Sequence, residues 1–182
     1  KARRSYSWAF DPHMDIFEAD VDGANLRRLS DAAGYDAEGA YSPDGNRVVF
    51  CSFRNGNGDL YIMDRDGGNL CQLTDSPGYD GGPFFSPDGK RVIFRGEVRR
   101  RKYLQLFVVN ADGTEERQLT DNDFVNWGPY WHPGGKHVIY ATSRHGHRNY
   151  ELYLLKIDTG RQERVTHSPG ADILPVFSPD RR

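Results

Sequence analysis

The sequence has few cysteines, no long apolar run and no excess of charge of either sign, and each shortage excludes a class of protein. Cys51 and Cys71 are its only cysteines, too few for a disulfide framework or a cluster of metal-binding thiolates. No apolar segment approaches the ~18 residues that a membrane-spanning helix needs. Its 24 Lys and Arg nearly balance 26 Asp and Glu, which gives a formal net charge of −2. We therefore expect neither membrane insertion nor the strongly basic surface of a nucleic-acid-binding protein.

Glycine, proline and aromatic residues, in contrast, are plentiful. The chain has 20 Gly, 10 Pro and 13% aromatic residues, although only 37% of it is hydrophobic. Aromatic side chains favour β-strands, and Gly and Pro favour the tight turns between them. No apolar stripe of helical period runs for a useful length. The composition therefore predicts an all-β protein made of short strands.

A four-residue turn motif recurs at a nearly constant interval. SPDG stands at Ser42 and Ser86, HPGG at His132, and SPDR at Ser178. The starts lie 44, 46 and 46 residues apart. A Pro-Asp-Gly turn alone predicts only a turn, but a fixed period of this size is typical of repeat architectures.

Each repeat has the pattern of four short strands. The second and third strands are predicted from alternating or wholly apolar runs, such as RVVFCS from Arg47 and DLYIMD from Asp59. A short strand with a Leu-Thr pair follows, and then a Gly-rich link leads to an aromatic strand before the next turn motif. One such sheet cannot bury both of its faces alone, so the sheets are expected to stack around an axis. A unit of this length with four antiparallel strands predicts a blade of a β-propeller.

The repeat resembles that of TolB-like β-propellers. The resemblance rests on FSPDGKRVIF (Phe85 to Phe94) and DLYIMDRDGGNLCQLTD (Asp59 to Asp75), and related motifs recur in the same order over almost the whole chain. Such repeats occur in periplasmic scaffold proteins, in propeller domains of serine peptidases and in lyases. The resemblance thus implies a periplasmic or secreted propeller, and it leaves the function open because fold does not fix function.

We expect a single propeller domain over residues 1–182, with four blades' worth of sequence. The predicted blades cover approximately 1–31, 38–75, 82–121 and 128–167. The first lacks an inner strand, which residues 172–179 could supply. That pairing would close a four-blade ring within one chain. The alternatives are a part of a larger ring, or self-association of two chains that share a ring.

One polar position recurs six residues before each turn motif. It holds Asp36, Asp80, Asn126 and Asp172. If the links between blades cross toward the axis, symmetry places these side chains in a ring at the channel mouth, where they could bind Ca²⁺, another cation or a ligand. The alternative is that each one caps its own Gly-rich turn through backbone N–H groups.

A second candidate site lies in the loops between the second and third strands. The segment SRHGHRNYE contains Arg144, His145, His147 and Arg148, and Arg54 stands in the matching loop of an earlier repeat. The histidines could bind a metal and the arginines a carboxylate, although no third metal ligand follows at a helpful spacing. Another such loop carries the basic run from Arg99 to Lys102, which is too small to indicate nucleic-acid binding.

No catalytic constellation is present in the sequence. It has neither a GxSxG nor an HExxH motif, and its six histidines do not recur at one repeat position. We expect a non-catalytic scaffold without a cofactor, which binds a protein or a small ligand through its loop rim and channel mouth, with a protein as the favoured partner. The alternative is the propeller part of an enzyme, either a peptidase-gating domain or a carbohydrate-active lyase.

Overall fold

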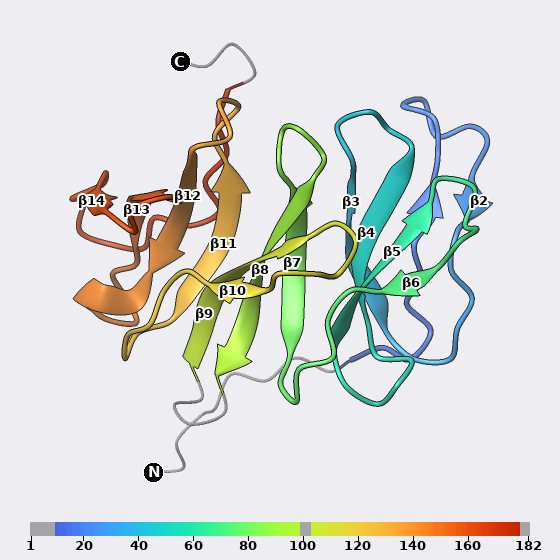
Figure 1. Ribbon diagram of the computed structural model, residues 1–182, viewed down its shortest axis with the longest axis horizontal. Coiled ribbons are helices and arrows are strands. Elements are labelled where there is room, and N and C mark those ends of the chain that lie inside the picture. Colours follow the sequence, from blue (N-terminus) through green and yellow to red (C-terminus); the bar gives the residue numbers. More distant parts are fainter. Residues whose placement is uncertain (1–9, 99–102, 179–182) are drawn as a thin grey trace.

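Most of the predicted runs form β-strands in the computed structural model, which describes residues 10–98 and 103–178. Four antiparallel sheets follow one another along the chain (Figure 1). In the described residues the first sheet has two strands: β1 (Phe17–Glu18) and β2 (Arg27–Arg28). The second has four: β3 (Asp36–Tyr41), β4 (Arg47–Ser52), β5 (Asp59–Asp64) and β6 (Cys71–Gln72).

The third and fourth sheets repeat the plan of the second. The third contains β7 (Asp80–Phe85), β8 (Arg91–Val98), β9 (Tyr103–Asn110) and β10 (Arg117–Gln118). The fourth contains β11 (Asn126–Trp131), β12 (His137–Thr142), β13 (Glu151–Lys156) and β14 (Gln162–Arg164), with a 3₁₀ turn, η1 (Ser143–His145), between β12 and β13. These sheets confirm the all-β fold of four-stranded antiparallel blades.

The repeated turn motif joins the first two strands of each blade. Ser42 Oγ donates to Asp44 over 2.5 Å and accepts the N–H of Arg47 over 3.0 Å, and Ser86 repeats both contacts. The glycine of the motif lies in the left-handed region, with φ of 71° at Gly45. Residues other than glycine rarely adopt this backbone conformation, which explains why the glycine recurs.

The hydrophobic core lies between neighbouring sheets. One cluster joins Val49, Cys51 and Leu60 of the second sheet to Phe85 and Val92 of the third. Aromatic residues also face each other across paired strands within each complete sheet: Phe50 faces Tyr61, Phe94 faces Phe107 and Tyr140 faces Tyr153. Face-to-face stacking thus buries the apolar residues that one sheet alone would expose.

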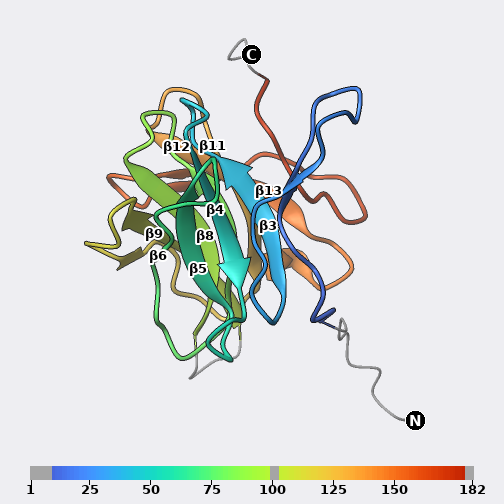
Figure 2. The same ribbon diagram turned by 90° about the vertical axis from the view of Figure 1, so that its right-hand side faces the viewer.

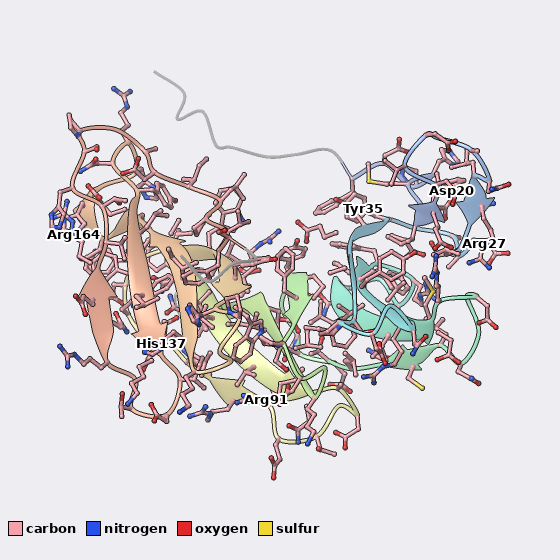
Figure 3. The ribbon with its side chains drawn as sticks, turned by 90° about the horizontal axis from the view of Figure 1, so that it is seen from above. Asp20, Arg27, Tyr35, Arg91, His137 and Arg164 are labelled. Atoms are coloured by element: carbon pink, nitrogen blue, oxygen red, sulfur yellow. The ribbon has the colours of Figure 1, made fainter. Side chains whose placement is uncertain are left out.

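The sheets follow one another along an open arc, with the first and fourth at its two ends (Figure 3). Seen from the side, they stand one behind another (Figure 2). Residues 171–178 form no strand in the described part of the chain and lie against the fourth sheet instead. The ring of Phe177 packs on His132 at 4.8 Å, and Leu174 lies beside Gly128. The start of the first predicted blade, to which residues 172–179 could supply the inner strand, lies outside the described residues over residues 1–9.

Candidate functional site

The recurring polar residues stand at the start of the inner strands rather than in links that cross to the axis. Asp36, Asp80 and Asn126 are the first residues of β3, β7 and β11, and all three are buried. Asp172 occupies the matching place in the last segment: its N–H donates to Tyr150 over 2.8 Å, as that of Asp80 does to Gly58 over 2.7 Å. These backbone bonds connect each inner strand to the loop of the preceding sheet.

Their side chains are held locally. Asp36 pairs with Arg54 at 3.0 Å, and Asn126 Nδ2 donates to Gln105 Oε1 at 2.9 Å and to Thr120 Oγ1 at 3.2 Å. Burial raises the pKa of Asp80 to about 7, against the opposing hydrogen bond from Thr74. Within the described part of the chain, one oxygen of each of the four side chains has no hydrogen-bond partner.

The expected ring of carboxylates around a cation is not formed. Among the described residues, no three or more His, Cys, Asp or Glu side chains lie close enough to hold a metal ion. The side chains of Asp36, Asp80 and Asn126 instead contact other side chains among the described residues, so these contacts do not match the capping alternative, in which each one bonds backbone N–H groups of its own turn.

The arginines of the loop rim stack on aromatic rings of their own sheets. The guanidinium of Arg54 lies 4.6 Å from the ring centre of Tyr61, and that of Arg144 lies 4.8 Å from Tyr153. Arg144 also donates to Gln162 over 2.7 Å. Both arginines are thus engaged within the fold at equivalent positions, which favours a structural role for them.

The two histidines of the same rim differ in their surroundings. His145 Nε2 lies 2.9 Å from the hydroxyl of Tyr153, the same ring on which the guanidinium of Arg144 stacks. His147 is exposed and lines a pocket of about 430 Å³ with Trp127 and Tyr150. Arg148 is exposed beside it. The basic run from Arg99 to Lys102 lies outside the described residues.

A polar cluster that the sequence analysis missed lies between the second and third sheets. Arg95 of β8 has a side chain only 5% exposed, and its Nη2 is ion-paired with Glu38 Oε1 of β3. The hydroxyl of Tyr79 donates to Glu38 Oε2 over 2.7 Å, and the N–H of Gly82 donates to the same oxygen over 2.7 Å. Two donors of the third sheet, and a third from the residue just before it, therefore surround one carboxylate of the second. We call Glu38, Tyr79, Gly82 and Arg95 the Arg95 cluster.

The backbone of the inner strands creates the space for this cluster. The inner strand of each complete sheet shifts its register, and its third residue adopts a left-handed conformation: φ is 58° at Gly82, 59° at Gly128 and 60° at Glu38. A Cβ atom at Gly82 would lie 1.9 Å from Arg95 Nη1, and one at Gly81 would lie 2.0 Å from the Tyr79 hydroxyl. Only glycine leaves room for these side chains.

Trp127 of β11 connects the Arg95 cluster to the pocket at the rim. The guanidinium of Arg95 lies 6.0 Å from the ring centre of Trp127 and 5.5 Å from that of Tyr79. The same Trp127 lines the 430 Å³ pocket beside Leu104, Val125 and Ile173. A buried cation, aromatic faces and a mostly apolar hollow are thus contiguous around Trp127.

One signal in the sequence could have identified Arg95. Its repeat position holds Cys51 in the second sheet and Ala141 in the fourth, and both of these residues are fully buried. An arginine where the other repeats place small apolar residues breaks the pattern. Once buried, its charge needs an acidic partner or a ligand. A search for polar positions that recur cannot find a residue that occurs once.

Comparison with known proteins identifies the fold. No protein-family model matches the sequence, and no curated protein is significantly similar to it. A structure assigned as TolB from Agrobacterium tumefaciens is 27% identical, with a TM-score of 0.70, over 82% of this chain and 55% of that one. TolB from Acinetobacter baumannii has a TM-score of 0.79 at 22% identity, over 91% of this chain and 40% of that one.

Enzymes share the same fold. Oligogalacturonate lyase from Vibrio parahaemolyticus has a TM-score of 0.64 at 19% identity, over 91% of this chain and 50% of that one. The chain spans about half the length of these solved structures. Its fold is that of a TolB-like β-propeller. No helix in the described residues is long and apolar enough to cross a membrane.

Proposed function

We propose that the chain is a non-catalytic binding propeller, which recognises a protein through the Arg95 cluster and the adjoining pocket at the loop rim. The observation that carries the proposal is the position of Trp127, which lies next to a buried guanidinium and also lines the 430 Å³ pocket. Aromatic residues and arginine are the side chains that most often anchor protein interfaces.

The shape and composition of the pocket support binding. Its lining is mostly apolar, with Leu104, Val125 and Ile173 around Trp127, and His147 and Tyr150 supply polar groups. Concave apolar sites with a few directed polar groups are typical of ligand recognition. The rim loop that contains His147 is thus retained in the proposed site, whereas Arg54 and Arg144 serve the fold.

The groups of the cluster are poorly suited to acid–base catalysis. Burial raises the pKa of the Tyr79 phenol, and Arg95 is already paired with Glu38. Neither group is poised to exchange a proton near neutral pH. We therefore favour binding without a cofactor over the lyase or peptidase alternatives, and we place the protein in the periplasm or outside the cell, as its resemblance to TolB-like repeats implies.

The experiment is capture of a partner from a periplasmic extract of the source organism on the immobilised protein. We expect Trp127→Ala to lose a specific partner that the parent retains, because it removes the ring shared by the cluster and the pocket. Leu70→Ala, a change at an exposed residue of the second sheet, is the matched control. Equal capture by the parent and Trp127→Ala would refute the proposed site, and cleavage of oligogalacturonate by the parent would refute the non-catalytic function.

A further inference from the structure

We propose that the Arg95 cluster is a carboxylate-binding site and that Glu38 is an internal occupant, which a carboxylate group of the partner replaces. The inference rests on the proposed binding function and specifies the chemistry that the partner must offer. It assigns an acidic side chain or a chain terminus of the partner to the position that the Glu38 carboxylate holds.

The donors of the cluster match a carboxylate. Arg95 Nη2 serves one oxygen of Glu38, and the Tyr79 hydroxyl and the Gly82 N–H serve the other. Gly82 and Arg95 belong to the third sheet and Tyr79 immediately precedes its first strand, so none of the three donors comes from the second sheet that supplies Glu38. Charge-assisted hydrogen bonds of this kind are among the strongest that proteins make.

Glu38 does not pair with every hydrogen-bond donor of the Arg95 guanidinium. The Nε of Arg95 is buried and has no hydrogen-bond partner in the described part of the chain. A buried polar group of this kind calls for an explanation, because it loses its hydration without gaining a partner. A carboxylate that approaches from another direction than Glu38 can bind the guanidinium through Nε and Nη2 together.

Glu38 is also held in an unfavourable backbone conformation. Its φ of 60° lies where the equivalent positions of the next two sheets have Gly82 and Gly128. A left-handed glutamate is strained, and such strain concentrates at functional sites. The side chain of Glu38 is 29% exposed, so it can leave the cluster for solvent without rearranging the core.

The competing explanation is that the ion pair only links the second and third sheets. Glu38→Gly distinguishes the two explanations. It removes the carboxylate from the Arg95 cluster, and it gives the position the glycine that the next two sheets have. Glu115→Gly is the matched control: Glu115 is also a left-handed glutamate, with φ of 56°, and is exposed far along the sequence from the cluster.

Propionate is the first probe, because it reproduces the side chain of Glu38 from Cβ outward. We expect 50 mM propionate to raise the melting temperature of Glu38→Gly by several degrees relative to chloride at equal ionic strength. It should not change that of the parent or of Glu115→Gly. No difference between propionate and chloride for Glu38→Gly would overturn the proposal.

Tetraglutamate is the second probe, measured by titration calorimetry. We expect it to bind Glu38→Gly at least tenfold more tightly than the parent or Glu115→Gly, since the parent must first displace Glu38. If Glu38→Gly does not fold, Glu38→Gln replaces it, because a neutral amide competes less well for Arg95. Equal affinities for parent and variant would overturn displacement. The two experiments can also disagree: Trp127→Ala could lose the captured partner while the parent and Glu38→Gly bind tetraglutamate equally. That result would support the proposed binding function and would show that the Arg95 cluster only links the two sheets.

Discussion

Asn126 Nδ2 donates to Thr120 Oγ1 across 3.2 Å, and this pair joins the inner strand of the fourth sheet to the segment that follows the last strand of the third. In the preceding repeat Asp80 stands beside Thr74 in the same relationship. One repeat therefore uses a neutral amide where another uses an ionisable carboxyl group, which makes the stability of the third sheet dependent on pH.

Asp80→Asn should remove this pH dependence. Burial raises the pKa of Asp80 from 3.8 to about 7, so between these values the folded protein holds the proton that the unfolded chain releases. The stabilisation is fully present below about pH 4 and is lost as the pH rises through about 7. We expect the variant to gain stability over the parent at pH 8 and little at pH 5, as measured by urea denaturation. Asp158→Asn, at an exposed carboxylate, should leave the parent's pH profile unchanged.

Phe94→Ala should destabilise the protein by about 3–5 kcal/mol. Phe94 is 1% exposed and stacks on Phe107 with ring centres 5.5 Å apart, so the variant leaves a cavity between sheets. The free energy of unfolding measures the loss, and Leu70→Ala at an exposed site should cost far less. A loss below roughly 1 kcal/mol would be incompatible with the packing described.

Gly82→Ala should cost more than Gly128→Ala, although the two residues have φ values of 58° and 59°. Both changes introduce the same backbone strain. At Gly82, however, the new Cβ would lie 1.9 Å from Arg95 Nη1, whereas at Gly128 the nearest atom is 3.6 Å away on Leu174. The difference between the two melting temperatures therefore measures the packing of the Arg95 cluster. Equal losses would mean that Arg95 moves aside freely.

Arg54→Ala should be strongly destabilising, by about 3–5 kcal/mol, because it leaves the Asp36 carboxylate buried without its partner. The side chain of Asp36 is only 1% exposed, and the pair is separated by 3.0 Å. Asp36→Asn in the same chain should recover part of the loss, since the amide carries no charge. A double-mutant cycle from denaturation curves gives the coupling energy, and additive effects would show that the pair does not interact.

The repeat pattern was sufficient to predict most of the strands and the turns. The turn glycines and the apolar alternation are local, so each could be assigned without knowledge of the neighbouring sheet. The position of Asp36, Asp80 and Asn126 was harder, because it depends on where the inner strand begins. The structure starts β3, β7 and β11 at these residues and turns their side chains toward local partners.

The Arg95 cluster could not be predicted in the same way. Its members come from three segments, and the ion pair joins residues 57 positions apart. Its geometry depends on a register shift that leaves Glu38 left-handed, a conformation that nothing about a glutamate in the sequence indicates. The one indication in the sequence was that Arg95 occupies the repeat position that holds Cys51 and Ala141 in the neighbouring sheets.

The second strand of each complete sheet is buried along nearly its whole length, whereas the first sheet has only two short paired strands in the described residues. Amide protons should therefore exchange with solvent at very unequal rates along the arc. Those of Val48 to Cys51, Val92 to Arg95 and Val138 to Ala141 will exchange only when whole sheets separate, while those of Phe17 and Arg28 will exchange through local fraying. We therefore expect exchange to be fastest in the first sheet and slowest in the second strands of the three complete sheets.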